Sequence, residues 1–501
     1  MKTPLSYWLS LPVAAAVLAP LAVLAWLGLQ ADLAFDASNA AIVINSVLLT
    51  VLTVFGAILL GVPLALATTY IRLPGRTLWL ALLAAPLAMP SYLGAFAYFA
   101  AFGPGGTLET LTGVATPNVR GLAGATLVMT LYTYPFVLLT TRSALRHLNP
   151  AMLDAARTLG LSPGRALLSV VLPRARNGIA AGALLVALYT LSDFGTPAIL
   201  RLDTFTRMIF VEYNAFGLDR AALLSLQLLA LVAVILWLET RFGAERERPT
   251  RTATLDLGAG WRAATMTAGL LLMLAALALP LLVFGHYLWR EGLGEFDPML
   301  AWHSAYAAGL AAVAAVVVAL PVAYAAGLGR GGRLLERIAH LGFGVPGIVL
   351  ATALVYVGLQ LSVLYQTLAL LVIGYVLRFL PLAVGSLRTR LERIEHHQIA
   401  AARSLGAAPF EAFRRITLPL ALPGIVAGAA LVFLEAMREL PATLLLQPTG
   451  FETLATYLWR VYEAGYLGRG AVPALLLVLI SAGALVALLT GEERAGEARG
   501  A

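Results

Sequence analysis

Long apolar runs with few or no charged residues recur along the whole chain, and short polar segments separate them. The hydrocarbon core of a bilayer is about 30 Å thick, so one helical crossing needs roughly 20 apolar residues. The runs therefore predict an all-α integral membrane protein with about twelve spanning helices. The expected helices lie near 8–29, 42–70, 77–101, 121–143, 178–200, 220–240, 264–289, 303–327, 337–360, 366–388, 423–447 and 472–490.

The first of these runs follows a single lysine, Lys2, and so has one feature of a signal peptide. Its length and the lack of a clear small-residue cleavage site favour an uncleaved first helix instead.

Composition narrows the function classes. A chain of 501 residues that is 60% hydrophobic and 12% charged is too apolar for a soluble domain. The absence of cysteine excludes disulfides, thiolate metal sites and thiol catalysis. A P-loop needs a lysine at the nucleotide phosphates, and the only lysine, Lys2, lies outside any Gly-rich loop. The chain is therefore expected to bind no cofactor and to carry no P-loop ATPase.

The net charge of +8 is explained by the excess of Lys and Arg in cytoplasmic loops better than by a nucleic-acid partner. With the N-terminus inside, most of the 34 cations fall on the cytoplasmic side. They lie at Lys2 and within 72–76, 142–176, 241–262, 330–337, 388–415 and 494–499. The opposite orientation would invert this bias, so both termini are expected in the cytoplasm.

The chain is also a tandem repeat. Residues 154–160 (Asp-Ala-Ala-Arg-Thr-Leu-Gly) align with residues 400–406 (Ala-Ala-Ala-Arg-Ser-Leu-Gly), 246 residues later, and the same offset places Asp193 on Glu439. The Arg-rich segment 241–263 is the only sizeable polar linker. We therefore expect a first repeat over 1–240, a cytoplasmic linker over 241–263 and a second repeat over 264–501. Six helices per half make the repeats parallel.

Each repeated motif predicts two short helices joined by a turn. Paired alanines favour the first helix, glycine ends it in a left-handed conformation, and proline opens the second. A Leu-Pro pair is then expected to stop the second helix before the next span. The residues concerned are Asp154, Ala155, Ala156, Gly160, Pro163, Leu172 and Pro173 in the first copy, and Ala400, Ala401, Ala402, Gly406, Pro409, Leu418 and Pro419 in the second.

This doubled pattern, in the most Arg-rich interhelical loops, resembles the EAA loops of ABC-importer permeases. The resemblance covers nearly the whole chain and implies two fused six-helix repeats of the type I (MetI-like) class. It also implies that the loops dock two ATPase subunits, which bind ATP and Mg²⁺, and that a periplasmic solute-binding protein delivers the solute. The expected location is the bacterial inner membrane, among its lipids. Asp154 replaces the usual Glu, and Ala400 carries no carboxylate.

Other stretches are similar to the ferric-iron permease subfamily. They are Met89-Pro90-Ser91-Tyr92, Phe102-Gly103-Pro104-Gly105-Gly106, Gly344-Val345-Pro346-Gly347, Glu439-Leu440-Pro441-Ala442-Thr443 and Gly450-Phe451-Glu452-Thr453. Ferric iron is therefore the expected solute. Thiamine, polyamine and aminoethylphosphonate permeases share parts of the pattern and remain alternatives.

Charged residues inside the apolar runs mark either a transport pathway or a structural ion-pair cluster, because an unpaired charge in a membrane is costly. Spacings of three and four place Glu435, Arg438 and Glu439 on one face of the eleventh helix. Asp193 has the equivalent place in the fifth helix, and Arg378 lies in the tenth. These residues either line the pathway or neutralise one another between helices.

Ferric iron is a hard ion that prefers oxygen ligands, which the carboxylates and Tyr92 offer. The histidines show no metal-ligand spacing apart from one adjacent pair in a cytoplasmic loop, which is expected to be solvated. They are His147, His286, His303, His340, His396 and His397.

Two other classes of protein fit the composition. A twelve-helix secondary transporter would use the buried titratable residues to couple transport to an ion gradient, but it would leave the two repeated loops unexplained. A membrane-embedded enzyme would need a Ser/His/Asp or metal-ligand cluster, and the sequence offers none. The chain is thus expected to be a transport subunit and not an enzyme.

Overall fold

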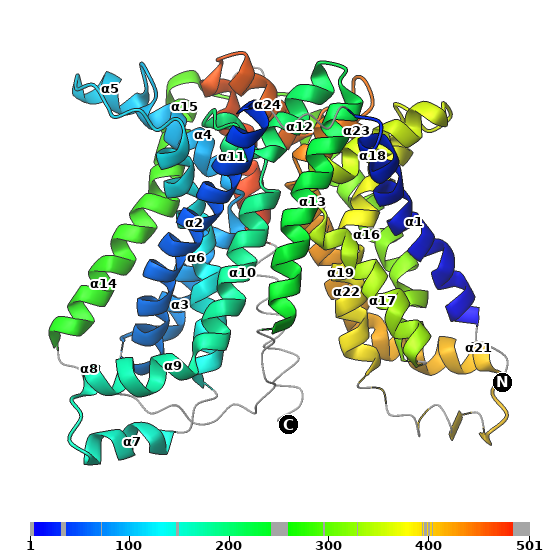
Figure 1. Cartoon of the computed structure of the whole chain (residues 1–501), viewed down its shortest axis with the longest axis horizontal. Helices are drawn as coiled ribbons and strands as arrows, with labels where there is room; N and C mark the ends of the chain where they lie inside the picture. The colour runs from blue at the N-terminus through cyan, green and yellow to red at the C-terminus, as the bar shows by residue number, and fades with distance from the viewer. Residues whose placement is uncertain are drawn as a thin grey trace.

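The computed structural model describes residues 5–31, 37–71, 73–146, 150–241, 259–293, 296–327, 329–392, 394, 398, 401–402 and 404–483. These residues are built almost entirely from helices, which confirms the all-α prediction (Figure 1).

Within the described residues, eight helices are long and apolar enough to cross a membrane, or up to eleven if each of three bent pairs is one span. These eight spans are α1 (Leu5–Gly28), α2 (Ala37–Tyr70), α6 (Leu122–Arg146), α13 (Leu218–Arg241), α14 to α15 (Ala259–Glu291), α16 (Met299–Ala326), α19 (Leu368–Leu391) and α21 to α22 (Phe410–Met437). A shorter apolar helix covers Leu467–Gly483, and the rest of the run expected over 472–490 lies outside the described residues.

Two predicted helices are broken before a proline. The run expected over 77–101 bends by 85° between α3 with its 3-10 turn η1 and α4, and the run expected over 337–360 bends by 98° between α17 and α18. Pro90 and Pro346 stand at the N-caps of α4 and α18. The residue before a proline avoids the helical region, which explains both breaks. The elements are α3 (Arg76–Ala84), η1 (Ala85–Ala88), α4 (Ser91–Phe102), α17 (Arg330–Gly344) and α18 (Gly347–Gln360).

The fifth and eleventh predicted helices also end early. Instead of running to residues 200 and 447, α10 ends at Ser192 and α22 ends at Met437. Short helices follow each end after a break of a few residues. The elements are α10 (Arg176–Ser192), α11 (Gly195–Ile199), α22 (Leu418–Met437) and α23 (Pro441–Leu446).

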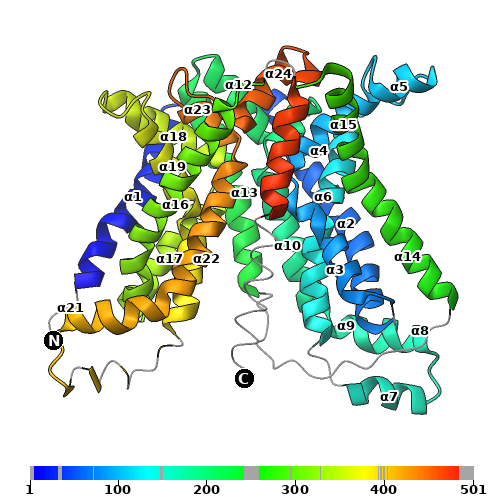
Figure 2. The ribbon, with the colours of Figure 1, turned by 180° about the vertical axis from the view of Figure 1, so that it is seen from behind.

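The two halves form similar bundles but exchange their first helices. Helices α2, α6 and α10 pack together, as do their counterparts α16, α19 and α22. Helix α1, however, packs against α16, α17 and α18 of the second half, while α14 and α15 contact α3 and α4 of the first (Figures 1 and 2). The repeats that are separate along the chain are therefore interlocked in space.

Opposite ends of the structure carry different short helices. Both repeated loop motifs lie at one end, on opposite sides of it, and α5, α12 and α24 lie at the other end (Figures 1 and 2). The motif elements are α7 (Pro150–Thr158), α8 (Pro163–Ala166), the π-helical turn η2 (Leu167–Val171), α9 (Leu172–Arg174), α21 (Pro409–Ala412) and the π-helical turn η4 (Phe413–Thr417). The opposite end has α5 (Thr107–Thr112), α12 (Phe205–Asn214) and α24 (Leu454–Glu463).

Candidate functional site

A polar cavity of about 100 Å³ lies where α10 and α22 end, with walls from both halves. Such a volume holds several water molecules. All six residues that the sequence singled out as pathway candidates line it: Tyr92, Asp193, Arg378, Glu435, Arg438 and Glu439. The fold thus brings together residues from four separate parts of the chain.

The second half contributes ion pairs to this cavity. Arg378 Nε lies 3.4 Å from Glu439 Oε2, and Arg438 Nε donates to Glu435 Oε2 at 3.2 Å. Arg438 also donates from Nη1 to the carbonyl of Leu87, in the first half, at 3.2 Å. These contacts neutralise two of the three cavity carboxylates and link the halves.

Asp193, the third carboxylate, is held differently. Its Oδ1 accepts from Ser91 Oγ at 2.7 Å, and its Oδ2 accepts from the backbone N–H of Thr196 at 3.0 Å. No cation lies within ion-pair distance of it in the described part of the chain. Asp193 is therefore hydrogen-bonded but carries no paired positive charge.

Asp193 and Glu439 share one structural role. Each accepts from the backbone N–H three residues ahead, of Thr196 and of Ala442 at 3.1 Å, in the first turn of the short helix that follows. A carboxylate near a helix N-terminus satisfies otherwise unpaired N–H groups. The prediction that Glu435 and Glu439 share a face of one helix is wrong, because α22 ends at Met437. The proline at position 441 opens α23 and interrupts the helix before it.

Around these equivalent acids, the halves differ. By the 246-residue offset, Tyr189 corresponds to Glu435, Ser192 to Arg438 and Tyr132 to Arg378. The first half therefore places hydroxyl groups where the second half places charges. Tyr189 and Ser192 also line the cavity, whereas Tyr132 donates to the carbonyl of Ala276 at 2.9 Å. Sequence reasoning missed these residues, although the repeat offset marks their positions.

Two glycines make room for the cavity walls. A Cβ at Gly347 would collide with the guanidinium of Arg378 and lie 2.6 Å from Glu439 Oε1. A Cβ at Gly195 would collide with Tyr92. Glycine is therefore needed at both positions, because a side chain from another element lies directly against the backbone there.

Two polar groups at the cavity have no hydrogen-bond partner in the described residues: the hydroxyl of Tyr92 and Nη1 of Arg378. Tyr92 is only 6% exposed. A buried polar group without a partner costs free energy, so these two groups are unsatisfied in this conformation.

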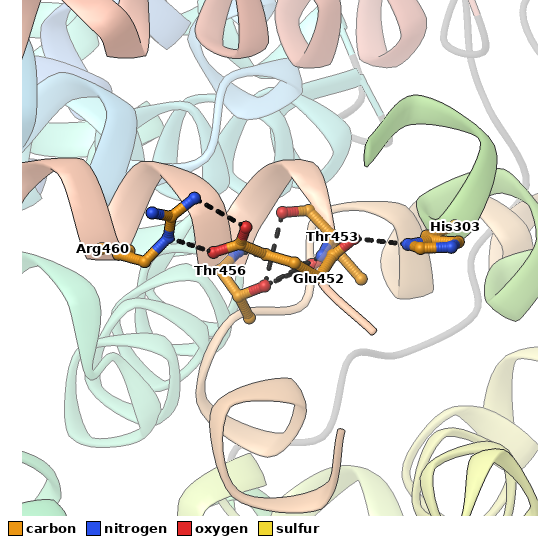
Figure 3. A network of polar contacts seen from close by, with 5 residues as sticks. All are labelled: His303, Glu452, Thr453, Thr456 and Arg460. Atoms are coloured by element: carbon orange, nitrogen blue, oxygen red, sulfur yellow. Dashed lines mark hydrogen bonds and ion pairs between the residues drawn. The ribbon is translucent and has the colours of Figure 1, made fainter. Parts of the chain in front are cut away.

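A second polar network, drawn in Figure 3, lies at the start of α24, and none of its residues lines the cavity. His303 Nδ1 lies 3.0 Å from the carbonyl oxygen of Glu452, whose carboxylate binds Arg460 through two contacts of 2.6 and 2.9 Å. Hydrogen bonding to Glu452 raises the pKa of Arg460 above its usual value. Thr453 and Thr456 form a capping box that starts α24.

The first half repeats this network in part. Asn45 donates to the carbonyl of Asp203 at 3.1 Å, as His303 contacts Glu452. Ser46 accepts from the backbone N–H of Phe205 at 3.0 Å, as Ser304 does from Leu454 at 2.8 Å. These contacts tie α12 to α2 and α24 to α16. His303 thus has a structural contact that its sequence context did not reveal.

None of these clusters is a preformed metal centre. Among the residues that the structure describes, no three His, Cys, Asp or Glu side chains are arranged to hold a metal ion. His147, His396 and His397 lie outside those residues.

The repeated loops adopt the predicted turn. Gly160 and Gly406 have φ of +85° and +91°, the left-handed conformation expected at the end of the first short helix. Ala156 is buried and Ala155 is exposed. The leucines just before the glycines, Leu159 and Leu405, are 85% and 88% exposed. Ala400 and the side chains of Asp154, Pro163 and Pro409 lie outside the described part.

The two Leu-Pro pairs behave differently. After Pro173 the chain bends by 66° between α9 and α10, as expected. The prediction that Pro419 stops its helix is wrong, because α21, η4 and α22 run on as one span. The π-helical turn Phe413–Thr417 lies directly before Leu418 and Pro419. The first copy has the same kind of turn, Leu167–Val171, directly before Leu172 and Pro173, and its bend falls only at Ala175. The turn shifts the hydrogen-bond ladder and accommodates the missing proline N–H in both copies.

Comparison with known proteins decides the family. The model of the family "Binding-protein-dependent transport system inner membrane component" matches residues 57–244 and 315–491, once in each half. The chain belongs to this family. It is a multi-pass inner-membrane permease of the ABC importer class, with two fused repeats. The exchanged first helices, α1 and α14 to α15, lie outside the matched segments.

Curated relatives support the same conclusion. The chain is 31% identical over 471 residues to the Fe(3+)-transport system permease protein FbpB 2 of Haemophilus influenzae, covering 90% of each protein. It is 27% identical over 493 residues to the probable ABC transporter permease protein y4fN of Sinorhizobium fredii, covering 89% of this chain and 86% of the relative. The spermidine/putrescine permease PotB of Haemophilus influenzae is 40% identical, but over 19% of this chain and 33% of its own length.

Proposed function

We propose that this permease imports ferric iron, and that the polar cavity between its halves is part of the route. The observation that carries the proposal is the convergence of three carboxylates and two tyrosines on one cavity at the ends of α10 and α22. Oxygen donors suit a hard cation. A relative that aligns with 90% of this chain and 90% of its own length is named as an Fe(3+) permease.

Energy for this transport comes from partner ATPases. Each half presents one loop at the same end of the structure, with an exposed leucine beside a left-handed glycine. Exposed apolar side chains at equivalent positions fit a docking surface for another protein. We infer that 154–173 and 400–419 each dock one ATPase subunit, so that two subunits bind ATP and Mg²⁺ while this chain binds no cofactor.

The two ends then face different compartments. The loop end is cytoplasmic by its arginine content, as are both termini and the 241–263 linker between repeats 1–240 and 264–501. The end with α12 and α24 receives a periplasmic solute-binding protein. Closure of the ATPases, transmitted through the loops, opens the cavity outward, and ATP hydrolysis returns it to the cytoplasmic side.

Polyamines and aminoethylphosphonate are weaker candidates as solutes. The relatives named for them match only 19% of this chain, whereas the iron permease matches 90%. Thiamine remains a candidate only through the sequence motifs. A competition experiment separates them: spheroplasts that express this chain with its partner subunits should take up radioactive ferric iron. Excess spermidine, 2-aminoethylphosphonate or thiamine should leave that uptake unchanged. Uptake of one of these solutes without uptake of iron would contradict the assignment.

A further inference from the structure

The two walls of the cavity differ in charge although they derive from equivalent sequence repeats. The second half supplies two carboxylates and two guanidinium groups, arranged as the pairs Arg378–Glu439 and Arg438–Glu435. The first half supplies one carboxylate, Asp193, and hydroxyl groups. With every group ionised, the cavity therefore has one more negative than positive charge.

We propose that the Asp193 wall is a transient binding site for a bare hard metal cation. We also propose that Arg378 and Arg438 neutralise the other two carboxylates, Glu439 and Glu435, in the conformation described here, so that these carboxylates do not bind the cation. The proposal rests on the importer function and deepens it. It assigns the acceptance of the cation to the first half and charge compensation to the second.

The donor groups on the Asp193 wall are all oxygens. Ser91 Oγ contacts Asp193 Oδ1, and the Tyr189 hydroxyl lies 3.5 Å from Ser91 Oγ. The Tyr92 hydroxyl is buried at the same cavity and has no partner in the described residues. A hard cation held by Asp193 would give this orphaned oxygen a partner. An anion would instead meet a carboxylate that forms no ion pair in the described residues.

One free carboxylate makes a weak site, which suits transport. The described residues form no cluster of three metal-ligating side chains, so the cavity is not a chelating cage. A site on a pathway must bind strongly enough to admit the ion and weakly enough to release it. The ion pairs of the second half keep the remaining carboxylates from adding to the affinity.

The competing explanation is that Asp193 only satisfies the N–H of Thr196 in the first turn of α11. The amide oxygen of asparagine accepts the same N–H hydrogen bond as a carboxylate oxygen. The variant Asp193→Asn therefore keeps this hydrogen bond and removes the negative charge, which separates the two explanations without breaking the fold.

A direct test uses Tb³⁺, a hard trivalent cation whose emission is sensitised by nearby tyrosines. The purified chain in detergent should show saturable sensitised emission. The apparent affinity should fall at least tenfold in Asp193→Asn and a few-fold in Tyr92→Phe. It should rise a few-fold in Arg438→Gln, because that change removes a competing cation. The control Glu212→Gln, which alters an acid paired with Arg220 away from the cavity, should leave it unchanged.

The outcomes separate this inference from the import of iron. Emission that is equal in wild type and Asp193→Asn, with equal thermal midpoints, would overturn the cation site. An affinity that falls in Arg438→Gln would also overturn it, since a purely structural cluster loosens when any member is lost. Reconstituted wild-type transporter that moves no ferric iron would refute the proposed function, whatever the Tb³⁺ result.

Discussion

Arg378 reaches Glu439 across the position of Gly347, with its Nε 3.4 Å from Glu439 Oε2. The three residues come from α19, from the segment after α22 and from the first residue of α18. The ion pair therefore exists only because the backbone at residue 347 carries no side chain.

The first prediction concerns this glycine. Gly347→Ala places a methyl group against the guanidinium of Arg378, so the ion pair must break or shift. Breaking a buried pair typically costs about 3 kcal/mol or more. The thermal midpoint of the purified protein should fall by several degrees. The control Gly309→Ala, in α16 where a Cβ meets nothing within 4 Å, should leave it equal or higher. Equal midpoints for both variants would refute a stabilising role for the pair.

The second prediction compares the two equivalent acids. Glu439→Gln leaves Arg378 without its carboxylate, whereas Asp193→Asn leaves no cation unpaired. We expect the first variant to lower the thermal midpoint markedly and the second to change it little. Adding Arg378→Gln to Glu439→Gln should recover part of the loss, because the uncompensated charge is gone. A double variant less stable than Glu439→Gln alone would contradict this account.

The third prediction concerns the loops. Gly160→Val and Gly406→Val put a β-branched residue at a left-handed position, which costs about 1–2 kcal/mol and distorts the turn. ATP hydrolysis should become uncoupled from transport, while insertion into the membrane survives. Gly164→Val is the matched control, because that glycine lies in the first loop without a positive φ and with open space around it. Normal coupled transport in the two loop variants, with ATPase bound, would exclude docking there.

The fourth prediction concerns orientation. The chain has no native cysteine, so single cysteines at Thr250 and Ala495 can be labelled selectively. Both should resist an impermeant thiol reagent added to intact spheroplasts, since positive charge places these segments in the cytoplasm. A cysteine at Phe216, which is 94% exposed at the opposite end, should react. Labelling at position 250 or 495 would contradict the predicted cytoplasmic location of these segments.

Much of the fold follows from local sequence. Apolar length predicts the spans, and the doubled glycine turn predicts the loop geometry at Gly160 and Gly406. The broken helices also carry a signal in the sequence, because Pro90, Pro346 and Pro441 each stand where a helix restarts. Hydropathy alone hides these breaks, since the residues on both sides are apolar and a window averages across them.

The geometry of the site depends on contacts between residues far apart in the sequence, and no local sequence pattern predicts these contacts. The 246-residue offset pairs Asp193 with Glu439, but it does not show that Arg378 reaches Glu439 or that Arg438 reaches Leu87. Those contacts depend on how α19 and α22 pack and on where α22 stops. The exchange of α1 between halves was equally hidden, because an apolar helix carries no polar signal for its partner.

The most direct test of the account is the energy source of iron uptake. Proteoliposomes that contain this chain, its ATPase partner and its solute-binding protein should accumulate ferric iron only when ATP is supplied to the ATPase. A protonophore should leave that uptake unchanged. Uptake that continues without ATP and collapses with the protonophore would contradict the account and assign the chain to the gradient-driven transporters.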